Sequence, residues 1–138
     1  MNILVVEDSR ATRKYLALLL TNDGHYVTAV ADGKQALSYL VTTVPDLVIT
    51  DLIMPAMDGY EMVKQLRKLP GRQQVPVVMI TAADLALIDK HLAAALRELP
   101  QLGPFHLLEK PAGPEDILKI VRSYCAIQNP PASAAGQG

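Results

Sequence analysis

Five short apolar segments, each followed by a stretch with the character of a helix, constrain the fold of this chain more than any other feature. The segments are residues 2–6, 25–31, 46–50, 75–80 and 105–109. Most of them are apolar throughout, which is typical of strands that are covered on both faces. Strands that alternate with helices form parallel sheets through right-handed crossovers. The expected fold class is therefore α/β, with a doubly wound, five-stranded parallel sheet and helices on both faces.

Helices are expected in the segments that follow the strands. Apolar residues recur at helical spacing in the first, second, third and last of these segments. These residues are Tyr15, Leu18 and Leu19; Leu37, Leu40 and Val41; Met62, Leu66 and Leu69; and Ile117, Ile120, Val121 and Tyr124. The fourth helix is expected to run from just after Thr81 to about Leu99, because Pro100 and Gly103-Pro104 then break the chain.

Length and charge limit the classes of function. The chain has 138 residues and a formal net charge of −1, so it fits one domain and offers no electrostatic reason to bind nucleic acid or an anionic membrane. We place the domain at residues 1–126 and interpret residues 127–138, rich in Pro, Ala and Gly, as a disordered tail. Cys125 is the only cysteine, and no apolar run approaches transmembrane length. These features predict a cytoplasmic protein.

Positive charge gathers locally in one run. Its members are Lys64, Arg67, Lys68 and Arg72. We interpret them as cations near a helix C-terminus, where the helix dipole favours positive charge, in preference to a phosphate-binding patch.

Polar residues stand at the ends of four strands. Glu7 and Asp8 follow the first strand, Asp51 ends the third, Thr81 the fourth and Lys110 the fifth. In an open parallel sheet, ligands bind outside the carboxyl ends of the strands, near the point where strand order reverses. These residues, although far apart in the chain, are therefore expected to converge. Each could singly be a helix cap or a solvated strand end, but five of them at one sheet edge favour a functional site.

The residue types at this edge suit phosphoryl transfer. Three carboxylates brought together repel one another and need a cation, and a site made of oxygen ligands suits Mg²⁺. A carboxylate beside such an ion, here Asp51, can attack a phosphoryl group. The hydroxyl group of Thr81 and the ammonium group of Lys110 are suitable donors to the other phosphoryl oxygens.

Four motifs together resemble those of a known family. They are VVEDS, DLIMPAMDG, Thr81-Ala82 and Lys110-Pro111, and the similarity covers about residues 2–125. The chain resembles the receiver domains of two-component response regulators, and in particular the single-domain chemotaxis type. That resemblance implies the flavodoxin-like strand order 2-1-3-4-5, for which the chemotaxis receiver is an established example.

The resemblance also implies the roles of the site residues. Asp51 would accept a phosphoryl group from a sensor histidine kinase or a histidine phosphotransfer protein. Asp8 and Asp51 would coordinate Mg²⁺, with Mn²⁺ as the alternative ion, Glu7 would act largely through water, and the backbone carbonyl of Ile53 would complete the protein ligands. Gly59 would permit a sharp turn into the next helix.

A receiver of this kind is not a turnover enzyme, because it catalyses only its own phosphorylation and dephosphorylation. Its expected output is altered binding to a downstream protein target, or transfer of the phosphoryl group as a shuttle. It would act as a monomer or as a phosphorylation-dependent homodimer, and this domain would bind neither nucleic acid nor membrane.

The sequence departs from the usual receiver pattern at two places. Receivers usually carry Tyr or Phe three residues before the conserved lysine, where this chain has Leu107. Phe105 would share a strand face with Leu107, which gives the hypothesis that it substitutes for the missing aromatic side chain. The segment between Thr81 and Lys110 is also several residues longer than usual, so we predict an altered fourth helix and output face.

Three other functions are compatible with this fold class. A hydrolase of the haloacid dehalogenase type needs a second acid two positions after its nucleophile, where this chain has Ile53. A flavin or dinucleotide carrier needs glycines in the first loop, which reads VVEDSRAT. The remaining alternative is a receiver-like protein-interaction module that works without phosphorylation.

Overall fold

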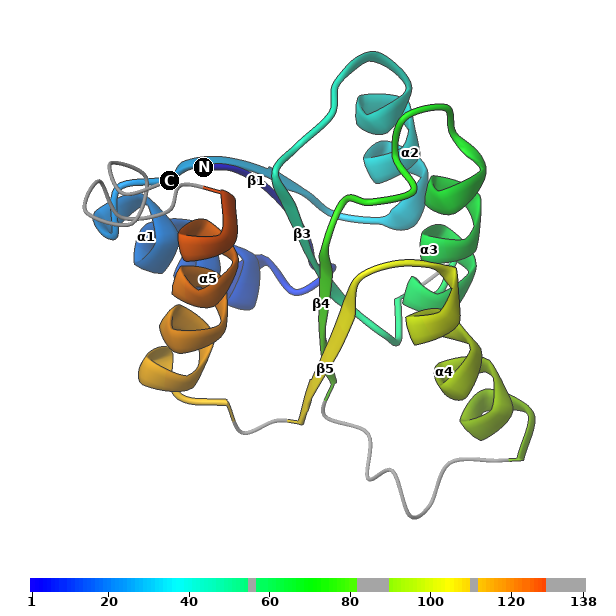
Figure 1. The fold of residues 1–138 in the computed structure, drawn as a ribbon. Coiled ribbons are helices and arrows are strands. Elements are labelled where there is room, and N and C mark those ends of the chain that lie inside the picture. Colours follow the sequence, from blue (N-terminus) through cyan, green and yellow to red (C-terminus); the bar gives the residue numbers. More distant parts are fainter. Residues whose placement is uncertain (55–56, 82–89, 110–111, 129–138) are drawn as a thin grey trace.

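The computed structural model describes residues 1–54, 57–81, 90–109 and 112–128. Strands and helices alternate along this part of the chain (Figure 1). The strands are β1 (Asn2–Val6), β2 (Tyr26–Val30), β3 (Leu47–Asp51), β4 (Val77–Thr81) and β5 (Phe105–Glu109). The helices are α1 (Arg10–Asn22), α2 (Gly33–Thr42), α3 (Gly59–Lys68), α4 (Lys90–Leu102) and α5 (Pro114–Gln128).

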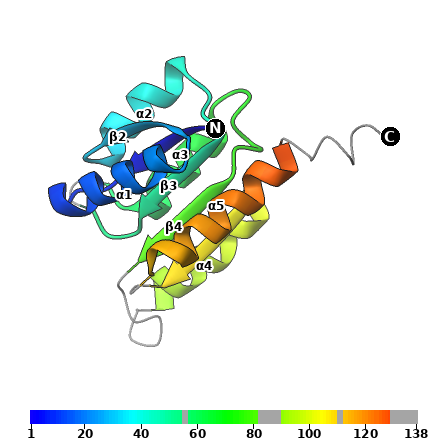
Figure 2. The ribbon, with the colours of Figure 1, turned by 90° about the vertical axis from the view of Figure 1, so that its left-hand side faces the viewer.

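All five strands form one parallel sheet in the order β2-β1-β3-β4-β5. Helices α1 and α5 cover one face of the sheet, and α2, α3 and α4 cover the other (Figure 1). From the side of the first pair, α1 and α5 lie in front of the strands (Figure 2). The predicted fold class and strand order are confirmed. The order reverses between β1 and β3, so the edge at their carboxyl ends is the expected position of a ligand site.

Side-chain caps explain where three of the helices begin. The side chains of Ser9, Asp32 and Asp58 each stand just before a helix and accept a hydrogen bond from a backbone N–H in its first turn. Such a cap satisfies one of the N–H groups that the first turn leaves without an intrahelical partner. Ser9 and Asp58 also fix the loops that follow β1 and β3, so the caps position the edge where the acids lie.

Each face of the sheet carries its own apolar core. The core beneath α2, α3 and α4 includes Leu40, Met62 and Leu66, and the core beneath α1 and α5 includes Leu20 and Val121. The apolar residues predicted at helical spacing on the third and last helices therefore include buried ones.

The apolar stripe predicted on the first helix is only partly covered, although Leu19 packs against the core. Tyr15 and Leu18 are 43% and 64% exposed, and the side chains buried on α1 are Leu16 and Leu20. Val41 on α2 is also exposed. The segment YLALLL is apolar at nearly every position, so more than one helical stripe fits its pattern. The position of the sheet, which the pattern does not contain, decides which stripe is covered.

The predicted end of the fourth helix is also wrong, because α4 continues through Pro100 to Leu102. Proline inside a helix removes one backbone hydrogen bond, and its ring crowds the carbonyl of the residue four positions earlier. Leu96 and Leu99 are buried on this helix, and their packing stabilises its last turns. The expected start of the fourth helix lies outside the described residues, as does the tail beyond Gln128.

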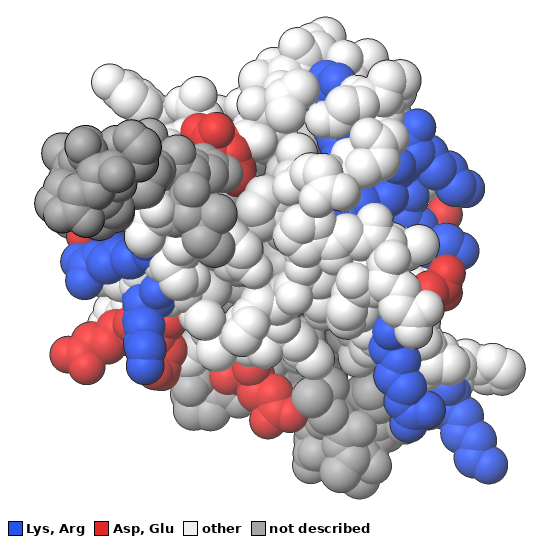
Figure 3. All heavy atoms as spheres, in the orientation of Figure 1, with Lys and Arg blue, Asp and Glu red and all other residues white. Residues whose placement is uncertain are grey.

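The basic run has a structural role that its position in the sequence did not reveal. Arg67 does lie in the last turn of α3, but its guanidinium group is buried and donates hydrogen bonds to four backbone carbonyls. The acceptors are Arg72, Gln73, Val75 and Pro104, at 3.1, 3.1, 2.6 and 2.7 Å. Arg67 therefore ties the loop after α3 to the start of β5. Other Lys and Arg side chains remain on the surface beside α3 (Figure 3).

Candidate functional site

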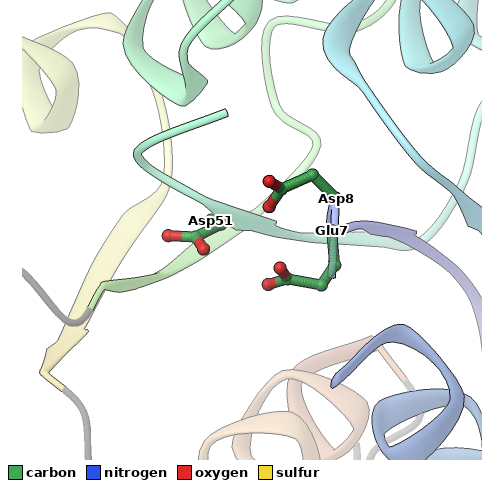
Figure 4. A group of neighbouring side chains, drawn as sticks. All are labelled: Glu7, Asp8 and Asp51. Atoms are coloured by element: carbon green, nitrogen blue, oxygen red, sulfur yellow. The ribbon is translucent and has the colours of Figure 1, made fainter. Parts of the chain in front are cut away.

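Three carboxylates meet at the edge where strand order reverses. Glu7 and Asp8 directly follow β1, and Asp51 is the last residue of β3. These two strands are neighbours in the sheet. Oxygen atoms of these three side chains all lie within 4.8 Å of one another. In Figure 4 the carboxylate of Glu7 points toward the side of α1 and α5, and that of Asp8 lies on the opposite side of the end of β1. The expected convergence of these acids is therefore found.

Glu7 is held in a buried position. Glu7 is only 3% exposed, and its Oε1 accepts a hydrogen bond of 3.0 Å from the backbone N–H of Ser9. Its own backbone N–H donates to the carbonyl of Val30 on β2, and Arg13 donates from α1 to its carbonyl. Burial of a carboxylate is costly unless hydrogen bonds or a cation compensate it. The loop after β1 thus positions this acid from both its main chain and its side chain.

Asp51 is held at the last position of β3. Its Oδ1 accepts a hydrogen bond of 2.7 Å from the backbone N–H of Leu52, and its backbone carbonyl accepts one of 2.9 Å from the hydroxyl group of Thr50. Asp51 is half-buried, whereas Asp8 is exposed. The carboxylate of Asp51 is therefore oriented by its own strand and remains partly open to solvent.

Gly59 supports this geometry by the absence of a side chain. A β-carbon at this position would lie 2.3 Å from the backbone carbonyl oxygen of Asp51, which is closer than real contacts allow. The N–H of Gly59 also donates to the carbonyl of Leu52 at 2.7 Å. Gly59 does not have a positive φ, so a left-handed backbone is not the reason for a glycine here. Its role is to let the first turn of α3 pack against the end of β3.

Two other predicted site residues, Thr81 and Ile53, belong to the described part of the chain. Thr81 ends β4 and is fully buried, next to the position that pairs with Asp51. The side chain of Ile53 is 61% exposed, so no core contact requires an apolar residue there. Lys110 and Pro111 lie outside the described residues.

The group of three carboxylates is suited to a hard divalent cation. Carboxylate oxygens are the ligands that Mg²⁺ prefers, and an ion among them would offset their mutual repulsion. An ion held by exposed and half-buried acids also keeps water or substrate ligands, which is the usual arrangement for Mg²⁺ in phosphoryl-transfer sites. The donor set therefore fits the ion that the sequence predicts.

Known proteins with similar sequences identify the family. A family model described as the response regulator receiver domain matches residues 3–122. The chain belongs to the response regulator receiver family. A 14.6 kDa uncharacterized protein from Leptolyngbya boryana is 36% identical over 125 residues, which cover 91% of this chain and 90% of that protein.

Two further relatives are similar over most of this receiver. The sensory transduction protein RegX3 of Mycolicibacterium smegmatis is 34% identical over 122 residues, which cover 88% of this chain and 49% of RegX3. The chain thus spans about half the length of that relative. The crystallised chemotaxis protein CheY4 of Vibrio cholerae superposes with a TM-score of 0.76 and 28% identity, covering 89% of this chain and 97% of that one. The chain is a receiver domain of two-component signal transduction, as predicted.

The structure shows where Phe105 and Leu107 lie, the two residues that differ from the usual receiver pattern on β5. Phe105 and Leu107 pack against the same core cluster, so they share a strand face as expected. Phe105 pairs with Val77, at the far end of β4 from Thr81. Val77 and Thr81 are four residues apart along β4, which corresponds to about 13 Å. Whether Phe105 replaces the missing aromatic side chain stays a hypothesis, and this register places it far from Asp51.

Two residues around the site were not predicted from the sequence to act there. Ser9 caps α1 and donates to Glu7, and Arg13 holds the carbonyls of Glu7 and Asp8. A serine immediately before a helix is a recognisable capping signal, so Ser9 could have been found. Arg13 carried no such signal, because its contacts depend on how the first turn of α1 lies over the loop.

Among the residues that the structure describes, no helix is long and apolar enough to cross a bilayer.

Proposed function

We propose that Asp51 accepts a phosphoryl group from a histidine of a sensor kinase or phosphotransfer protein in a Mg²⁺-dependent reaction, and that the acyl phosphate changes protein binding. The observation that carries this proposal is the approach of oxygen atoms of Glu7, Asp8 and Asp51 within 4.8 Å of one another at the switch point of a receiver fold. Asp8, Asp51 and the backbone carbonyl of Ile53 would hold the ion, with Mn²⁺ as the alternative, and Glu7 would act largely through water.

The residues of this chain perform the transfer chiefly by positioning. An oxygen of the Asp51 carboxylate attacks phosphorus, an acyl phosphate bond forms, and the bond from phosphorus to the imidazole nitrogen of the donor breaks. The N–H of Leu52 orients the carboxylate through Oδ1. When bound, the cation would screen the approach of the two anions and offset charge on the transferring oxygens. Attack of water on phosphorus later releases inorganic phosphate and restores Asp51.

Thr81 and Lys110 are proposed to contact the phosphoryl oxygens. Thr81 is fully buried at the end of β4, so we expect its hydroxyl group to reach the phosphoryl group through a local rearrangement of this strand end. The ammonium group of Lys110 would act as a compact point charge. Thr81 therefore links the chemistry to the segment that follows β4.

The cellular role follows from the same chemistry. Residues 1–126 would act as the phosphoacceptor domain without substrate turnover, in the cytoplasm, and would bind a separate downstream protein or pass the group on as a shuttle. Residues 127–138 would form a disordered tail. The domain would be a monomer or a phosphorylation-dependent homodimer.

The test is phosphorylation by a small donor. The chain is incubated with acetyl phosphate, with and without Mg²⁺, and the intact mass is measured, with Asp51→Asn as the control. One added phosphoryl group on the native chain in the presence of Mg²⁺, and none on the variant, would support the proposal. A folded, Mg²⁺-bound native chain that stays unmodified would favour the phosphorylation-independent interaction module.

A further inference from the structure

The outer side of β2 is an open edge of the sheet. In the described part of the chain only β1 pairs with β2, which lies at the end of the sheet away from α4 (Figure 2). Tyr26 is 79% exposed, and Thr28 and Ala29 are also exposed. The strand at the other edge, β5, is half-buried from Phe105 to Leu108. β2 is therefore the edge that is more available to another strand.

The hydrogen bonds of β2 show which of its backbone groups face outward. The N–H of Tyr26 and the carbonyl of Val30 both form hydrogen bonds with the segment of β1. Successive residues of a strand direct their backbone groups to opposite sides, so Tyr26, Thr28 and Val30 face β1. Val27 and Ala29 therefore direct their N–H and C=O groups away from the sheet, where a further strand could bind them.

β2 lacks the features that usually protect an edge strand from pairing. Charged side chains, above all Lys, as well as proline and β-bulges are the common protections. Residues 26–31 read YVTAVA and contain no charged residue and no proline. The pairing with β1 continues without interruption over the whole strand, so no bulge bends it. In residues 26–45 only Asp32 and Lys34 are charged, and their charges are opposite. This edge suits an uncharged strand.

A second copy of β2 meets that requirement. If two copies of the strand run antiparallel with Thr28 on the two-fold axis, Val27 of each copy lies opposite Ala29 of the other. These are the residues with outward backbone groups, so each opposed pair exchanges both of its N–H to C=O hydrogen bonds. Every outward group of Val27 and Ala29 in both copies then has a partner. The edge is thus self-complementary, as a two-fold interface must be.

The neighbours of the strand favour this register over the adjacent ones. With the axis at Val27, Ala29 would lie opposite His25, whose N–H already donates to the carbonyl of Leu20. With the axis at Ala29, Val27 would lie opposite Ala31, whose N–H already donates to Gln35. Only the axis at Thr28 pairs outward groups with outward groups throughout.

The side chains are compatible with the same register. Val30 packs against the core beneath α2, so Thr28 and Tyr26, at two-residue spacing, lie on that face of the sheet. Thr28 would lie opposite Thr28 of the second copy, and Tyr26 opposite Val30 of the second copy. Pairs of threonines, and pairs of an aromatic with a β-branched residue, stabilise antiparallel strands. No charged side chain would face its own copy.

We propose that this chain forms a symmetric dimer in which two β2 strands pair antiparallel about Thr28 and join the two sheets. The contact uses none of the acidic site, so it would form without phosphorylation. It therefore goes beyond the proposed function and differs from the phosphorylation-dependent homodimer considered there. Because the strands are short, the interface belongs to the small, weak class, and we expect a Kd on the order of 100 µM.

Sedimentation of the full chain at concentrations from about 10 µM to about 1 mM tests the proposal. The solutions contain neither Mg²⁺ nor a phosphodonor, so failure here leaves phosphoryl acceptance untouched. We expect an equilibrium between monomer and dimer. A chain that stays monomeric over this range would overturn the proposal, even if the same edge binds an extended segment of another protein.

Amide hydrogen exchange, measured by NMR at both ends of that range, locates the contact. The N–H groups of Val27 and Ala29 should exchange about fourfold more slowly at the higher concentration, because the dimer alone bonds them. Those of Tyr26 and Thr28 bond to β1 in the monomer and should respond less. A dimer whose concentration-dependent protection lies in another strand or helix would overturn the proposed position.

Two variants with a matched control test the register. Thr28→Lys places like charges opposite each other on the two-fold axis and should weaken dimerisation at least about tenfold, whereas Thr28→Val should change it by less than about threefold. Ala29→Pro removes an outward N–H, which an edge strand tolerates, and should also weaken dimerisation about tenfold. Circular dichroism confirms that each variant folds. A dimer that both Thr28→Lys and Ala29→Pro leave intact would contradict pairing through β2.

Discussion

The backbone carbonyl of Asp51 and the α-carbon of Gly59 lie so close together that a β-carbon on residue 59 would be 2.3 Å from the carbonyl oxygen. The first turn of α3 thus packs directly against the end of the strand that carries the proposed phosphoacceptor. Any side chain at residue 59 must displace one of these two segments.

Replacement of Gly59 by Ala should therefore disturb both stability and chemistry. We expect the free energy of unfolding to fall by about 1–3 kcal/mol, as in other overpacked sites, and the rate of phosphorylation by acetyl phosphate to fall as well. Urea unfolding and intact mass measure the two effects. Gly113→Ala is the matched control, because a β-carbon there would make only an ordinary contact, at 3.6 Å, and should change stability by less than about 0.5 kcal/mol. Similar behaviour of the two variants would contradict the close-packing argument.

Removal of the Arg67 guanidinium should destabilise the fold without affecting the site. Arg67→Met leaves four carbonyls without their donor, and we expect a loss of about 2–4 kcal/mol in urea unfolding. Lys68→Met, at an exposed neighbouring position, should cost less than about 0.5 kcal/mol. Arg67→Lys should also be destabilising, because a single ammonium group cannot reproduce the fork of donors. A stability loss no greater than that of the Lys68 variant would refute the role assigned to Arg67.

A hydrogen bond between Tyr60 and Glu98 connects α3 to α4. The hydroxyl group of Tyr60 donates to Oε2 of Glu98 at 2.8 Å, and the ammonium group of Lys64 lies 5.3 Å from the centre of the Tyr60 ring. Tyr60→Phe should lower the free energy of unfolding and speed hydrogen exchange in α4. A double-mutant cycle with Glu98→Gln measures the coupling directly. Additive effects of the two substitutions would show that this bond does not link the helices.

Stability should depend on pH through His25. Burial is the main cause that lowers the pKa of His25 from its ordinary value of 6.5, although the nearby Asp23 carboxylate opposes the shift. Above pH 6.5 the imidazole is neutral in both the folded and unfolded chain. As pH falls below 6.5, the unfolded chain takes up the proton first, so the free energy of unfolding should decrease.

Urea unfolding between pH 8 and pH 5 checks this dependence, with His25→Gln compared with the native chain. The variant should lose stability less steeply with falling pH. His91→Gln, at an exposed histidine, serves as the control and should keep the native slope. If the free energy of unfolding of the His25 variant falls with pH as steeply as that of the native chain, other groups cause the pH dependence.

The strand ends were the part of the molecule most open to prediction from sequence. Continuous apolar runs such as residues 46–50 can form only buried strands or helix segments, and an acid at the end of such a run stands out against it. Parallel pairing then brings the carboxyl ends to one edge whatever the loops do. This is why the sequence alone predicts that Glu7, Asp8 and Asp51 lie together.

Features that depend on packing in three dimensions could not be predicted in the same way. The covered face of α1 depends on where the sheet lies, because Tyr15, Leu16 and Leu18 are all apolar. Arg67 looked like any other cation at a helix end, and its four acceptors lie in loops whose path the sequence did not specify. Pro100 has a known local cost, but the burial of Leu99 outweighs it.

The most direct test of the central claim is the position of the phosphoryl group. After incubation with acetyl phosphate and Mg²⁺, borohydride reduces an aspartyl phosphate to homoserine, and peptide mass spectrometry then locates the reduced residue. We predict homoserine at residue 51 in the native chain and none in Asp51→Asn. Homoserine at Asp8 or Asp58 instead, or an unmodified native chain that binds Mg²⁺, would contradict the role of Asp51 as the phosphoacceptor.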